Sequence, residues 1–161
     1  MTDEVDEVVA AWAREREDLA LDAMHVWSRI SRLAGILDAH RKRAFSEHGI
    51  EGWEFDVLAA LRRAGEPYRL SPGQLLRETH VTSGTMTNRV DRLVARGAVT
   101  RDPDPSDGRG VLVALTEDGL SLVDAALASL VEVEEDLLDG WGESDRDRFA
   151  DYLRRLLLGS Q

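Results

Sequence analysis

Apolar residues recur every three or four positions along most of the chain, which is the period of an amphipathic helix. This spacing predicts a long helix over about 19–46 and a shorter helix over 5–16 before it. Further helices are predicted over about 55–64, 72–78, 82–96 and 117–138, with a last one from 144. The hydrophobic pattern therefore predicts a mainly α-helical protein.

Two of these helices carry clear boundary signals. The spacing of Ser71 and Gln74 is that of a capping box, and Pro72 stands at the first helical position, so Ser71 is the predicted N-cap. Gly97 is expected to end the next helix in the left-handed conformation. Two helices joined by a three- or four-residue turn are typical of a helix-turn-helix.

The only strand-like stretches follow directly. Residues 98–101 and 111–116 have strand composition, and the turn-forming residues between them predict a β-hairpin with a long tip. The expected fold is mainly α with a small β-hairpin wing: a winged helix-turn-helix flanked by N- and C-terminal helices. We divide it into N-terminal helices (1–48), the winged helix-turn-helix (49–116) and C-terminal helices (117–161).

Composition excludes several function classes. The chain has 161 residues and no cysteine, which removes disulfides, thiolate metal sites and thiol nucleophiles. Its longest apolar runs are short and it lacks a signal-like N-terminus, so we expect a soluble cytoplasmic protein without membrane contact. It has no phosphate-binding glycine loop and no hydrolase or metalloprotease motif, so we expect neither an enzyme nor a cofactor. His25, His40, His48 and His80 lack a tight metal-binding spacing, and no metal site is expected.

Charge is distributed unevenly. The formal net charge is −11, which opposes unpatterned binding to polyanions. Residues 62–109, however, contain nine arginines and six acids, a net +3, whereas the rest of the chain, with 11 basic and 25 acidic residues, carries −14. A locally basic helix-turn-helix with a hairpin favours DNA binding, with the second helix in the major groove.

Helical geometry selects the side chains that could reach DNA. The face of residues 82–96 opposite Met86, Val90 and Leu93 carries Gly84, Thr85, Asn88, Asp91 and Arg92. Asparagine can pair with adenine and arginine with guanine, and hydroxyls suit phosphates or base edges. The expected DNA contacts are Ser71, Gln74, Ser83, Gly84, Thr85, Thr87, Asn88, Arg92 and, at the hairpin tip, Arg109. An ordinary solvated helix face is the alternative.

Four segments form a specific series: TNRVDRL at 87–93, GAVTR at 97–101, DPSDGR at 104–109 and LT at 115–116. Together they resemble the signature of MarR-family transcription regulators. The resemblance implies a winged-helix homodimer, joined by its terminal helices, that binds a pseudo-palindromic operator and usually represses. Gly108 departs from the family pattern, which often has a second arginine there, and this puts one phosphate contact in doubt.

A second resemblance concerns a ligand site. Trp12, Asp56, Arg89 and Arg101 resemble the site of the urate-responsive, PecS-like branch, which implies release from DNA by a small anionic effector such as urate. Arginine forks and an aromatic wall suit a planar anion. The alternatives are intramolecular ion pairs for the arginines and a packing role for Trp12. A different aromatic or carboxylate effector, or a protein-interaction module that uses the acidic terminal helices, also stays open.

Overall fold

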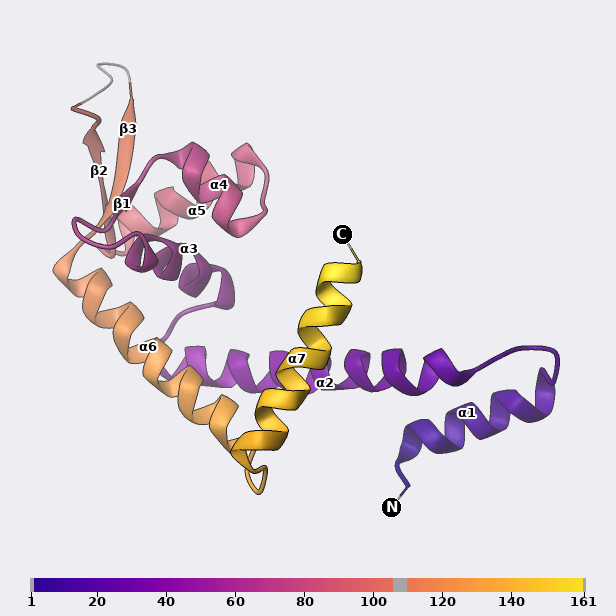
Figure 1. Cartoon of the computed structure of the whole chain (residues 1–161). Helices are drawn as coiled ribbons and strands as arrows, with labels where there is room; N and C mark the ends of the chain where they lie inside the picture. Colours follow the sequence, from indigo (N-terminus) through magenta and orange to yellow (C-terminus); the bar gives the residue numbers. More distant parts are fainter. Residues whose placement is uncertain (1, 106–109, 161) are drawn as a thin grey trace. The chain divides into compact units, whose positions relative to one another are not determined.

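The computed structural model describes residues 2–105 and 110–160 (Figure 1). Within them the helices are α1 (Glu4–Glu15), α2 (Asp22–Glu47), α3 (Gly52–Arg63), α4 (Pro72–Thr79), α5 (Ser83–Ala95), α6 (Glu117–Asp136) and α7 (Glu143–Gly159). The strands are β1 (Arg69–Leu70), β2 (Val99–Pro103) and β3 (Val111–Leu115). The predicted fold, mainly α with a winged helix-turn-helix, is confirmed.

The chain comprises two compact units, Met1–Arg43 and Ala44–Gln161. The second unit contains the helix-turn-helix, the wing and both C-terminal helices. The three-part division expected from the sequence stays a prediction.

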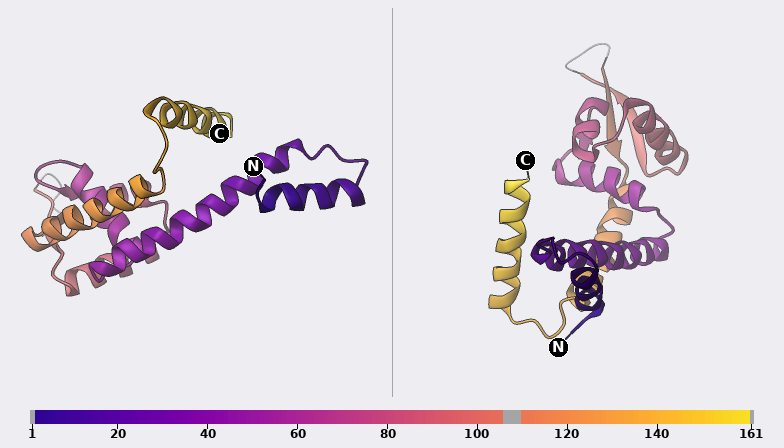
Figure 2. Two further views of the ribbon diagram at one scale, coloured as in Figure 1. Left: turned by 90° about the horizontal axis from the view of Figure 1, so that it is seen from below. Right: turned by 90° about the vertical axis from the view of Figure 1, so that its right-hand side faces the viewer.

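In the first unit, α1 lies alongside the N-terminal part of α2 (Figure 2). Val5 and Val9 are buried, and Arg29 of α2 pairs with Asp3 and Asp6 at 2.8 Å each. Asp3 also caps α1 by accepting from the backbone N–H groups of Val5 and Asp6. The hydrogen bond from Arg29 holds the pKa of Asp3 below its ordinary value. Both apolar burial and ion pairs therefore hold this helical hairpin.

In the second unit, one core lies between α3, α4, α5, α6 and the sheet. Leu58, Leu61, Leu75, Leu93 and Val113 are each 0% exposed and belong to the same buried cluster. Burial of side chains of this size stabilises by about 1.5–3 kcal/mol each. The core therefore fixes how α5 is presented.

The sheet has the antiparallel order β1-β3-β2. Val99 pairs with Leu115 and Pro103 with Val111, which is the predicted hairpin. The prediction of strands at this hairpin alone was wrong, because Arg69 pairs with Ala114 to add β1. A two-residue strand is too short to show alternation, so it forms only because β3 offers a free edge.

The local boundary signals are confirmed. Ser71 Oγ accepts from Gln74 N at 3.3 Å while Gln74 Oε1 accepts from Ser71 N at 2.8 Å, a complete capping box. Gly97 has φ +80°, which ends α5 in the left-handed region. No helix in the ranges 2–105 and 110–160 is long and apolar enough to cross a membrane.

Candidate nucleic-acid interface

Helix α5 has one buried and one exposed face. Met86, Val90 and Leu93 are at most 2% exposed and pack into the core. Gly84, Thr85, Asn88 and Arg92 are exposed, as the helical spacing predicted. The core therefore anchors α5 and leaves a row of polar residues exposed on its opposite face.

The hydroxyl residues near the start of α5 differ in their local bonding. Thr82 is the N-cap but makes no side-chain capping bond, and its Oγ1 lies 3.0 Å from Thr85 Oγ1. Thr87 Oγ1 donates to the Ser83 carbonyl at 3.1 Å, so its hydroxyl proton is used within the helix. Ser83 is exposed. The uncapped N–H groups of this first turn are suited to an anionic acceptor.

Ser71 and Gln74 act first as the cap of α4. Ser71 Oγ accepts from the Gln74 backbone N–H, and Gln74 Oε1 accepts from the Ser71 backbone N–H, so both oxygens are already used as acceptors. The Ser71 hydroxyl proton and the Gln74 amide protons are the donors left for an outside acceptor. A DNA contact at either residue would therefore be made as a donor.

Two α5 arginines lie over one aromatic ring of α3. The guanidinium carbon of Arg92 is 4.5 Å from the Trp53 ring centroid, and that of Arg89 is 5.5 Å from it. Arg92 Nη2 also donates to Glu51 Oε1 at 2.8 Å. An open depression of about 420 Å³ lies here, lined by Trp53, Gly84, Thr85, Asn88, Arg89 and Arg92.

A third arginine ties the end of α5 to the start of α3. Arg96 donates to Glu54 Oε1 at 3.2 Å and to the Gly49 carbonyl at 2.8 Å. Glu54 is only 5% exposed, and its other oxygen accepts from Glu51 N at 2.8 Å. A buried carboxylate needs such partners, so this pair fixes α5 against α3.

The sequence reasoning missed Glu51, Trp53, Glu54 and Arg96. A local signal existed for two of them, because Glu51 and Glu54 have the i, i+3 spacing of a capping box and form one. Nothing local links them to arginines about 40 positions away. That link exists only because α3 and α5 pack together.

Arg101 is occupied inside the domain. It pairs with Asp91 and donates to the Thr87 carbonyl at 3.4 Å, which joins β2 to α5. Asp91, expected on the DNA-facing side, is exposed but serves as this partner. Arg101 also lines a small pocket of about 90 Å³ between α4 and α5.

Two of the four residues of the expected effector site, Arg89 and Arg101, line two different depressions in the second unit. Asp56 is exposed on α3, one helical turn after Trp53. Trp12 belongs to the first compact unit and is 50% exposed. Their joint role stays a prediction.

The remaining residues considered in the sequence are the expected wing contact, Arg109, and the histidines. Arg109 and Gly108 lie outside the described residues. Among residues 2–105 and 110–160, no group of three or more His, Cys, Asp or Glu side chains is placed to hold a metal ion. His48 instead contacts Ser129, with Nε2 and Oγ 2.9 Å apart.

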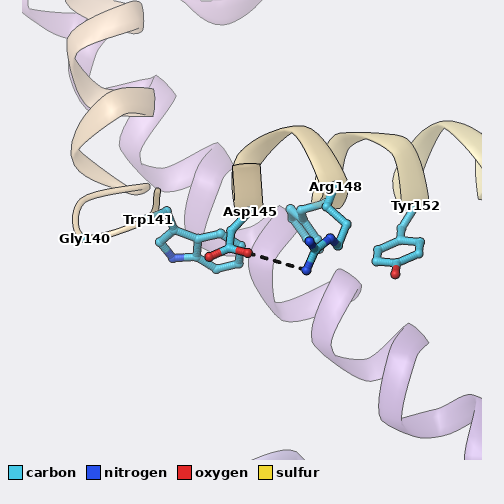
Figure 3. A pocket seen from close by; sticks show the side chains of 6 residues that line it. Gly140, Trp141, Asp145, Arg148 and Tyr152 are labelled. Atoms are coloured by element: carbon cyan, nitrogen blue, oxygen red, sulfur yellow. Dashed lines mark ion pairs between the residues drawn. The ribbon is translucent and has the colours of Figure 1, made fainter. Parts of the chain in front are cut away.

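A second open depression, of about 450 Å³, lies where α6 turns into α7 (Figure 3). Trp141 packs against Phe149 with ring centroids 5.5 Å apart, and Asp145 and Arg148 pair at 3.8 Å. Tyr152 lies further along α7 and is 53% exposed. The sequence reasoning predicted no site here.

Comparisons with known proteins agree with this geometry. The model of the MarR family matches residues 48–110. The transcriptional regulator PecS of Dickeya dadantii is 36% identical over 154 residues, 96% of this chain and 90% of PecS.

Two solved structures share the fold. A MarR mutant from E. coli in complex with operator DNA aligns at TM-score 0.72 and 25% identity, over 85% of this chain and 96% of that chain. BpsR of Bordetella bronchiseptica, whose DNA binding is regulated by 6-hydroxynicotinic acid, aligns at TM-score 0.68 and 26% identity, over 81% and 91% of the two chains. With a relative aligned over nearly its full length and the same winged helix, the chain belongs to the MarR family of transcriptional regulators.

Proposed function

We propose that this regulator is a ligand-responsive repressor that binds a pseudo-palindromic operator as a homodimer and is released by a small anionic effector such as urate. The observation that carries the proposal is the exposed polar face of α5, held on a buried core in a fold shared with a MarR–operator complex. Asn88 and Arg92 have the chemistry to read base edges in the major groove.

DNA geometry and the exposed apolar side chains of the terminal helices support the proposed homodimer. Two recognition helices must be about 34 Å apart to enter successive major grooves, which one chain with one such helix cannot achieve. The terminal helices expose large apolar side chains that a partner would cover. Trp27 and Leu33 of α2 are 53% and 52% exposed, and Leu157 of α7 is 68% exposed.

The effector proposal rests on the arginines around α5. Arg89 lies over Trp53 at the edge of the helix, and Asp56 follows one turn later on α3. An anion that engages Arg89 would change the charge beside the DNA-facing residues. Trp12 is half exposed and can supply an aromatic wall.

Two alternative functions are also considered. A different aromatic or carboxylate effector is favoured by the likeness to BpsR, because 6-hydroxynicotinic acid is itself a planar aromatic acid. A protein-interaction module that uses the acidic terminal helices is the reading from another class. A salt titration separates it, since the apparent affinity for DNA must fall steeply with salt if phosphates are bound.

The test is fluorescence anisotropy of the purified protein on duplex from upstream of its own gene, at fixed salt, with urate titrated into the complex. We expect release at micromolar to millimolar urate, with control anions inert. If urate does not release the DNA, urate is not the effector, but the proposal that the protein is a DNA-binding regulator still holds. An affinity for duplex that does not change with salt contradicts the repressor itself.

Variants locate the two surfaces. Arg92→Ala should weaken operator binding, whereas Arg16→Ala, which removes the same charge from a loop pair with Asp18, should not. Trp12→Ala and Arg89→Ala should weaken the response to urate. Unchanged operator affinity in Arg92→Ala would show that α5 does not contact the DNA as proposed.

A further inference from the structure

Glu51 and Trp53 both contact Arg92, an arginine that the proposed function places against DNA. Arg92 Nη2 donates to Glu51 Oε1 at 2.8 Å, and the guanidinium carbon lies 4.5 Å from the Trp53 ring centroid. Hydrogen bonding by Arg92, and to a smaller extent by the Trp53 side chain, holds the pKa of Glu51 below its ordinary value. Glu51 is therefore a carboxylate kept ionised beside α5.

This pair lies at the rim of the surface that we propose to face DNA. Arg92 lines the 420 Å³ depression together with Asn88, Thr85 and Gly84 of α5. The side chains of Arg92 and Glu51 are 54% and 61% exposed, so an outside acceptor can reach the Arg92 donors beside Glu51. The pair is solvated and can be broken, unlike the pair of Arg96 with the buried Glu54.

A carboxylate and a DNA acceptor compete for the same donors. Guanidinium forms its best hydrogen bonds with anionic oxygens, whether they belong to a carboxylate or to a phosphate. While Glu51 accepts from Nη2, that donor is not available to the operator, and the carboxylate also repels approaching phosphates. Trp53 holds the guanidinium plane by its ring face and does not compete for its N–H donors.

We propose that Glu51 is an affinity-setting residue: in the free protein it acts as an internal anionic competitor that binds Arg92, and operator binding requires Arg92 to leave it. This inference rests on the proposed DNA contact of α5 and adds a residue of α3 to it. Glu51 thereby lowers the affinity of the regulator for DNA.

The test compares Glu51→Gln with the parent by anisotropy across a salt series. Glutamine keeps the shape and an acceptor oxygen for the start of α3 but loses the charge. We expect operator affinity to rise about two- to fivefold, the range that a solvated ion pair supports. Glu78→Gln is the matched control, because it removes the same charge from the neighbouring α4, where Glu78 pairs with Arg63 at 3.4 Å.

A double-mutant cycle shows whether Glu51 acts through Arg92. In an Arg92→Ala background, Glu51→Gln should lose most of its effect, whereas Glu78→Gln should behave as it does in the parent. If Glu51→Gln and Glu78→Gln raise operator affinity equally, Glu51 acts only by general charge repulsion of DNA, which overturns the inference. Weaker binding by a folded Glu51→Gln protein would show that the pair positions Arg92 for DNA, which also overturns it.

The control experiment on the parent separates the two proposals. If the parent binds the operator in a salt-sensitive way but Glu51→Gln binds no more tightly, the proposal that Glu51 competes with DNA is refuted. The proposed repressor function then still stands. An affinity of the parent for duplex that is independent of salt refutes both. Thermal melting of each variant confirms that folded proteins are compared.

Discussion

Gly119 lies where α6 starts against the backbone of the wing, and there is no space there for a side chain. A Cβ at this position would lie 1.9 Å from the Ala98 carbonyl oxygen and 2.9 Å from its carbon. That oxygen accepts from Thr116 N at 3.1 Å, and Thr116 Oγ1 in turn accepts from Gly119 N at 2.9 Å. Gly119→Ala therefore forces α6 away from Ala98, the residue before β2, at the point where the helix is capped.

The magnitude follows from these contacts. The gap must open by roughly 1.5 Å to reach an ordinary carbon–oxygen contact. Overpacking of this kind costs about 1–3 kcal/mol, and weakening the Thr116 cap adds about 1 kcal/mol. The higher helix propensity of alanine relative to glycine offsets about 1 kcal/mol of this loss of stability. We expect Gly119→Ala to lower the free energy of unfolding by about 1–3 kcal/mol.

The assay is urea unfolding followed by circular dichroism, at one protein concentration because the proposed dimerisation would add to the apparent stability. Gly84→Ala is the matched control: Gly84 lies in the first turn of α5, and its Cβ would have nothing within 4 Å. The control should match the parent or exceed it by up to about 1 kcal/mol. A Gly119→Ala protein as stable as the Gly84→Ala protein would refute the steric argument.

Three further predictions concern the core, a cap and an ion pair. Leu93→Ala should lower the free energy of unfolding by about 2–5 kcal/mol, because Leu93 is 0% exposed; a loss below 1 kcal/mol in urea unfolding would contradict its core role. Ser71→Ala should cost about 1 kcal/mol and speed amide exchange at Gln74, and exchange equal to the parent's would show that the hydroxyl does not cap α4. Arg29→Ala should return the pKa of Asp3 toward its ordinary 3.8, as read by carboxyl NMR titration. Because the folded pKa of Asp3 lies below the unfolded value, this ion pair stabilises the folded state above about pH 4, and its contribution is lost as pH falls through the folded pKa. An unchanged pKa of Asp3 in the variant would contradict the role of Arg29 in this pair.

Several features of the site could be predicted because they depend on neighbours in the chain. The exposed row Gly84, Thr85, Asn88 and Arg92 follows from the helical period and from the buried positions of α5. The capping box at Ser71 follows from residue types three positions apart. Such rules need no knowledge of what packs against the helix.

Other features could not be predicted because they join residues far apart in sequence. Arg92 reaches Glu51 and Trp53 only because α3 and α5 pack on one core. The same packing decides that Arg96 serves a buried carboxylate, although its residue type would equally suit a DNA contact. Residue type alone leaves both roles open, since arginine binds carboxylate and phosphate with the same geometry.

By itself the sequence determined the helices, their caps, the hairpin and the resemblance to MarR regulators, since periodicity, capping and turn chemistry act over a few residues. The tertiary structure alone decided that β1 joins the sheet, that Gly119 meets the Ala98 carbonyl, and that Arg101 is bound by Asp91. These contacts depend on the relative placement of whole elements, which the packing of the core fixes. Local pattern thus identified the helix that we propose to read DNA, and packing determined which arginines in and around it already have partners.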